Sequence, residues 1–164
     1  MLDTAPNPEL AAIAAPDGGW RDPKPFLENV HPGEWDRLVT LLVRDNPFDT
    51  TMAERLLGQA VAYLITAMEH YDDPKLQHIG CGYLVDIAVH TIILDTPFYR
   101  SFCAAHFDGR FLDHLPEIER RNDGTVVHTA VVLAQNGFWV DEPLWAADYA
   151  KCSPCGGGEG QKCH

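Results

Sequence analysis

Basic residues are scarce in this chain. Twelve Lys and Arg stand against 24 Asp and Glu, which gives a formal net charge of −12. Proteins that bind nucleic acid hold phosphates with clustered Lys and Arg, and the only adjacent basic pair is Arg120-Arg121. We therefore expect no nucleic-acid partner. A narrower alternative is that the acidic surface mimics nucleic acid and blocks a protein that binds it.

Long apolar runs are missing as well. No stretch approaches the roughly 20 apolar residues that cross a bilayer as a helix, so we expect no membrane partner. The first four residues lack the basic and apolar regions of a signal peptide, so we expect a cytoplasmic protein. The five cysteines are an odd number with three in the last thirteen residues, unlike a secreted disulfide framework.

The familiar catalytic motifs are absent too. The chain has no G-x-S-x-G, no P-loop and no dinucleotide-binding fingerprint. Its two serines, Ser101 and Ser153, do not stand between a strand pattern and a helix pattern. These absences argue against a serine hydrolase and against the common nucleotide-binding enzymes.

What the sequence does contain is helical periodicity, clearest over residues 51–95. Thr51 and Glu54 fit a capping box, and apolar residues then recur with the spacing of one helix face as far as Met68. Asp73-Pro74 predicts the start of a second helix, which would run through Gly80-Cys81-Gly82 to about Asp95. Residues 125–136 are rich in valine, but their length and the following Gly137 favour a helix.

These patterns together predict an all-α protein. We expect an irregular helical bundle or a short α-solenoid-like stack of six to eight helices. Residues 1–32 carry six of the twelve prolines and are expected to form an irregular arm with one short helix. The helical domain would span residues 33–150, with a further short helix near residues 111–118. Residues 151–164 form a Gly- and Cys-rich tail.

Residues 73–88 and residues 123–136 align with each other without gaps. The first of these stretches resembles the third helix of an armadillo repeat. That helix has a capping Asp and Pro, small residues at its packing point, and an ending like residues 84–87. The aligned pairs are Asp73 with Asp123, His78 with His128, Gly80 with Ala130, and Asp86 with Asn136. The resemblance to armadillo and HEAT repeats covers about residues 51–137, with Asp86 in place of the family's Asn. It implies a scaffold whose concave surface binds a protein partner.

The tail contains a candidate zinc site. Cys152 and Cys155 form a C-x-x-C pair followed by glycines, which resembles a zinc knuckle. Cys163 is a plausible third ligand and His164 a fourth. Adjacent residues reach one tetrahedral ion with difficulty, so a body histidine such as His31 or His128, or a second chain, is an alternative source of the fourth ligand. A flexible tail with incidental thiols and a redox pair are the other interpretations.

A second candidate site lies on the central helices. Asp86 and His90 are four residues apart and share a helix face, as metal ligands and acid–base pairs can. His78, and Glu69-His70 at the end of the preceding helix, could join them. A hydrogen-bonded histidine in the core is the plainer interpretation of each. His114 is expected to be an ordinary loop residue.

We therefore expect a small acidic protein-binding module, an adaptor or inhibitor, with a structural zinc in its tail. The alternative is a helical metal-dependent enzyme that uses Asp86, His90 and His78. An internal site with converging titratable groups would favour the enzyme.

Overall fold

The computed structural model of the chain describes residues 6–74, 76, 79–115 and 124–149, and the side chains as far as residue 146. This part of the chain folds into helices joined by short irregular segments and contains no strand. The helices are α1 (Pro8–Ala11), α2 (Lys24–Glu28), α3 (Glu34–Asp45), α4 (Thr50–Glu69), α5 (Tyr83–Leu94), α6 (Thr96–His106), α7 (Thr125–Gln135) and α8 (Glu142–Tyr149). The prediction of an all-α fold with six to eight helices is confirmed. The armadillo-like repeat stays a prediction.

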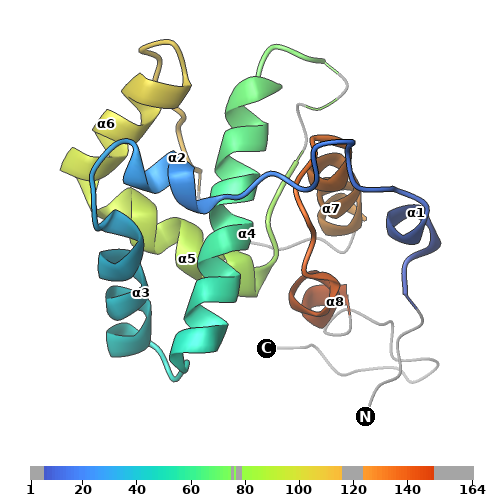
Figure 1. Cartoon of the computed structure of the whole chain (residues 1–164), viewed down its shortest axis with the longest axis horizontal. Coiled ribbons are helices and arrows are strands. Elements are labelled where there is room, and N and C mark those ends of the chain that lie inside the picture. The colour runs from blue at the N-terminus through green and yellow to red at the C-terminus, as the bar shows by residue number, and fades with distance from the viewer. Residues whose placement is uncertain (1–5, 75, 77–78, 116–123, 150–164) are drawn as a thin grey trace, which may run out of the picture.

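Helix α4 lies at the centre of the molecule. It stands between α3, α5 and α6 on one side and α7 and α8 on the other, with α1 outermost beside α7 (Figure 1). Neighbours on both sides bury most of its residues, including Leu57, Val61 and Ile65. The expected capping box is wrong, because Asp49 rather than Thr51 caps the helix by accepting a 2.7 Å bond from the Met52 N–H. No helix in the described residues is long and apolar enough to cross a membrane.

The predicted second helix begins later than the sequence suggests. Residues 79–82 are irregular, and α5 begins at Tyr83 with Gly82 as its extended N-cap. Two glycines within three residues cost a helix about 2 kcal/mol relative to alanine, and here nothing offsets that cost. Instead, the Gly80 N–H donates a 2.9 Å bond to Thr129 Oγ1 on α7. Cys81 therefore lies on an irregular segment, and not inside the helix that the sequence predicts.

The segment after α6 differs from its prediction too. Residues 111–115, where a short helix was expected to begin, are irregular. Their backbone is held instead by Tyr99 of α6, whose hydroxyl donates a 2.6 Å bond to the Leu112 carbonyl. Burial raises the pKa of Tyr99 far above its usual value, so the phenol stays a donor across the accessible pH range.

The described part of the N-terminal arm packs on the helical body. It contains α2 as well as α1, so it is less irregular than the sequence predicts. Arg21 fixes its course: the backbone N–H donates a 2.8 Å bond to the Gly137 carbonyl, and the guanidinium pairs with Glu69 at 2.7 Å. The same guanidinium lies over the Phe138 ring, 4.4 Å from its centroid.

Helix α7 confirms the helical interpretation of residues 125–136. It ends at Gln135, and Gly137 follows in the left-handed conformation at φ +84°. Residues 138–141 then pass alongside α4 and lead to α8. Gln59 of α4 holds this segment in place, because its amide is almost fully buried and bonds three groups of residues 139–145.

Candidate metal centre

Three metal-ligating side chains come together beside α5. Asp86 and His90 project from adjacent turns of the helix, and His114 approaches from the irregular segment after α6. The His90 and His114 Nε2 atoms lie 3.0 Å apart. Asp86 Oδ1 lies 3.7 Å from the His90 Nε2 and 3.4 Å from the His114 Nε2. The three atoms form a nearly equilateral triangle.

The dimensions of this triangle match a bound transition-metal ion. Nitrogen and oxygen ligands lie about 2.0–2.2 Å from zinc, so two ligands of a tetrahedral site are about 3.3 Å apart. The three observed distances, 3.0, 3.4 and 3.7 Å, bracket that value. Asp86, His90 and His114 would therefore be the residues that hold such an ion.

The alternative occupant of the triangle is a proton. Without an ion, one imidazole must donate its Nε2–H to the other, or to the Asp86 carboxylate, while the remaining ring accepts. Such a network places a proton between two of the three facing atoms. A cation accepts all three at once, which is why two imidazoles and a carboxylate so often bind metal.

The electrostatics of the site favour a cation. The Asp86 carboxylate supplies one negative charge directly, and the net charge of −12 on the chain raises the local concentration of cations. The Asp86 side chain is only 12% exposed, whereas His90 is 45% exposed. The Asp86 carboxylate therefore lies on the buried side of the site, and His90 lies on the side that solvent can reach.

Neighbouring groups hold the ligands in place. The Cys81 thiol lies 3.5 Å from Asp86 Oδ1, the same oxygen that faces the two histidines. Tyr99 holds the segment that carries His114 through the bond to Leu112 described above. Contacts of this kind orient metal ligands, and their loss typically weakens binding by 10- to 100-fold.

The sequence anticipates only part of this site. It places Asp86 and His90 on one helix face, as the structure confirms, but it does not find His114. That residue lies 24 positions from His90 on an irregular segment, and no local periodicity predicts their contact. His78, the third residue expected from the sequence, lies outside the described residues.

The other residues proposed for the central cluster lie elsewhere. His70 caps α4 and contacts Asn136 Oδ1 at 3.1 Å, and Glu69 pairs with Arg21. Burial opposes ionisation of Glu69, but the hydrogen bonds from Arg21 and Asn136 outweigh it and lower the pKa of this carboxyl. Both residues therefore fasten α4 to its neighbours and belong to no ligand set.

The tail residues Cys152, Cys155, Cys163 and His164 also lie outside the part of the chain that the structure describes. Their zinc site stays a prediction. His31, offered as an alternative ligand for it, is a surface residue beside Glu34.

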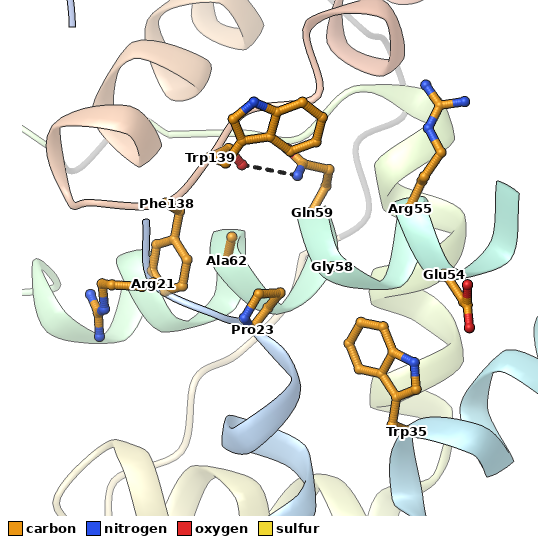
Figure 2. A pocket seen from close by; sticks show the side chains of 10 residues that line it. All are labelled: Arg21, Pro23, Trp35, Glu54, Arg55, Gly58, Gln59, Ala62, Phe138 and Trp139. Carbon is orange, nitrogen blue, oxygen red and sulfur yellow. Dashed lines mark hydrogen bonds between the residues drawn. The ribbon is translucent and has the colours of Figure 1, made fainter. Parts of the chain in front are cut away.

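A surface pocket lies on the opposite side of α4, between the arm, α3 and residues 138–139. Figure 2 shows Trp35 facing Gln59 and Trp139 across Gly58, with Arg21 and Phe138 at one end. Gln59 and Arg55, two polar residues of its lining, already have protein partners. Gln59 donates to the Trp139 carbonyl, and Arg55 makes two bonds to Asp141, at 2.7 and 2.9 Å. The pocket therefore lies where packed segments meet, and its lining does not bring reactive groups together as an active site would.

Comparison with known proteins does not assign the chain. No protein-family model, no curated protein and no solved structure matches it.

Proposed function

We propose that this protein is a helical metalloprotein that binds one divalent transition-metal ion through Asp86, His90 and His114. The observation that carries the proposal is the triangle of ligand atoms, whose sides match the ligand separations of a tetrahedral ion. Two imidazoles with one carboxylate suit Zn²⁺ or Fe²⁺ better than Mg²⁺ or Ca²⁺, which prefer oxygen ligands.

The ligand number favours an enzyme over a structural clip. Structural zinc sites are closed by four protein ligands, whereas catalytic sites have three and leave a position for water or substrate. Among the described residues the triangle offers three ligands, and His90 is partly open to solvent. A metal held there would act as a Lewis acid on a bound carbonyl or water. The proposal is thus the alternative that the sequence offered, a metal-dependent enzyme, with His114 in place of His78 as the third ligand.

The test is metal titration of chelator-treated protein. Cysteine-to-serine changes at positions 152, 155 and 163 first remove the predicted tail site. Co²⁺ should then bind with a stoichiometry near one, seen as visible d–d absorption, and His90→Ala or His114→Ala should abolish that absorption. The matched control is His128→Ala, which changes an exposed histidine of α7 and should bind as the parent does. Equal binding by all variants would contradict the proposal.

A second candidate function is the protein-binding module with a zinc tail. The observation that favours it is Trp139, which is 55% exposed at the pocket shown in Figure 2. Exposed tryptophans are frequent anchors of protein interfaces. Cross-linking in a lysate should then give a discrete adduct that Trp139→Ala loses and that Val43→Ala, an exposed apolar control on α3, retains. An adduct unaffected by Trp139→Ala would contradict this use of the surface.

A further inference from the structure

The two segments that supply the metal ligands also carry exposed apolar side chains. Among the described residues, seven large hydrophobic side chains are exposed, and four of them lie on the two segments that supply the metal ligands. These four are Tyr83 and Leu94 on α5, and Phe111 and Leu115 on the segment after α6. Exposed apolar side chains that lie close together typically mark a binding surface.

The spacing along α5 puts two of these side chains in line with the ligands. Tyr83, Asp86, His90 and Leu94 stand at i, i+3, i+7 and i+11, which is one face of a helix. Leu94 is 79% exposed and lies one turn beyond His90. The metal ligands therefore occupy the middle of a stripe with an apolar residue at each end.

The irregular segment repeats this arrangement. Leu115, which follows His114 directly, is 82% exposed. Phe111 lies three residues before His114. The Phe111 ring packs edge-on against Tyr99, 5.2 Å between centroids, so it is held beside the segment that Tyr99 anchors. Apolar side chains thus accompany the ligands on both elements of the site.

We infer that the open position of the metal takes a small ligand with an anionic oxygen head and an apolar body. This inference rests on the proposed metal site. A divalent ion beside the single Asp86 carboxylate leaves a net positive charge, which attracts an anionic head such as a carboxylate or hydroxamate. Leu94, one helix turn from His90, and Leu115, next to His114 in the chain, are the side chains that we expect an attached hydrocarbon chain to cover. Each methylene removed from water strengthens binding about fourfold.

Two hydroxamates of different chain length test the inference on the Co²⁺-loaded full-length protein. Acetohydroxamate and hexanohydroxamate have the same head, and they differ by four methylenes. Both should change the cobalt spectrum, and hexanohydroxamate should bind at least about tenfold more tightly, since burial of two methylenes suffices for this. In the double variant Leu94→Ser/Leu115→Ser the preference should fall below about threefold. Val43→Ser, which changes an exposed residue of α3, should leave it intact.

The outcomes separate this inference from the proposed function. Equal affinities for the two hydroxamates, or a preference that survives the double variant, would overturn the apolar ligand class. A bound cobalt whose spectrum neither hydroxamate changes would overturn the open position while the metal site stands. A protein that binds no cobalt would overturn both.

Discussion

Replacement of Gln59 tests how the C-terminal part of the fold is held to α4. Gln59 Oε1 accepts a 3.1 Å bond from the Asp141 N–H and a 2.8 Å bond from the Trp145 Nε1–H, and its Nε2 donates to the Trp139 carbonyl at 3.1 Å. Leucine has a similar volume and none of these polar atoms. Gln59→Leu therefore removes three hydrogen bonds and leaves the packing nearly unchanged.

The expected loss follows from which partners become unsatisfied. Asp141 and Trp145 are buried, so their two N–H groups have no water to replace Gln59, at a cost of about 1–3 kcal/mol each. Residue Trp139 is half exposed, so we assume that water replaces Gln59 at its carbonyl. The added leucine burial offsets about 1 kcal/mol. We expect a net destabilisation of about 3 kcal/mol, a large share of the 5–15 kcal/mol of a typical domain.

Urea unfolding followed by far-ultraviolet circular dichroism measures this difference. Gln135→Leu is the matched control, because Gln135 is exposed at the end of α7 and its replacement should change stability by less than about 0.5 kcal/mol. A Gln59→Leu protein that lost less than about 1 kcal/mol would refute the reasoning. It would mean that the Asp141 and Trp145 donors find other partners and that Gln59 does not hold this segment in place.

Three further predictions concern the anchors around the site and the arm. Tyr99→Phe removes the bond to Leu112, so Co²⁺ affinity should fall about tenfold with unchanged helix content by circular dichroism; unchanged affinity would show that the segment holds its place without this bond. Glu69→Gln should destabilise the protein at neutral pH, where the lowered pKa of Glu69 favours the folded state. This difference should shrink as the pH falls below about 4.5 through the lowered pKa, since protonation cancels the contribution; a constant difference in urea unfolding between pH 7 and pH 3 would contradict it. Gly137→Ala should cost about 1–2 kcal/mol in the same assay because φ is +84° and the new Cβ would lie 3.3 Å from Arg21 Cδ, and a neutral effect would mean that the backbone turns at no cost.

The sequence predicts those parts of the fold that depend on local signals. The apolar spacing of α4 and α7 and the local signals near their ends suffice to place these helices to within a few residues. The start of α5 was mispredicted because Asp73-Pro74 is a good cap and residues 76–92 keep a helical period. The helix starts only at Tyr83 because Gly80 and Gly82 lower helix stability and because the Gly80 N–H bonds Thr129 on α7. No local sequence pattern shows that bond.

The candidate site likewise has a part that local spacing predicts and a part that it does not. Asp86 and His90 lie on one helix, so their spacing alone predicts that they meet. His114 reaches them because Tyr99 fixes the backbone at Leu112, a contact between α6 and an irregular segment. Contacts of this kind depend on how helices pack, and single-residue patterns carry little information about packing.

The most direct test of the metal site is a Zn²⁺ titration by calorimetry at pH 7, with the three tail cysteines replaced by serine. We predict binding of about one ion per chain, and loss of that binding in the double variant His90→Ala/His114→Ala, whose circular dichroism should remain that of a helical protein. A helical parent protein that binds no zinc, or a double variant that still binds one ion, would contradict the assignment of Asp86, His90 and His114 as the metal ligands.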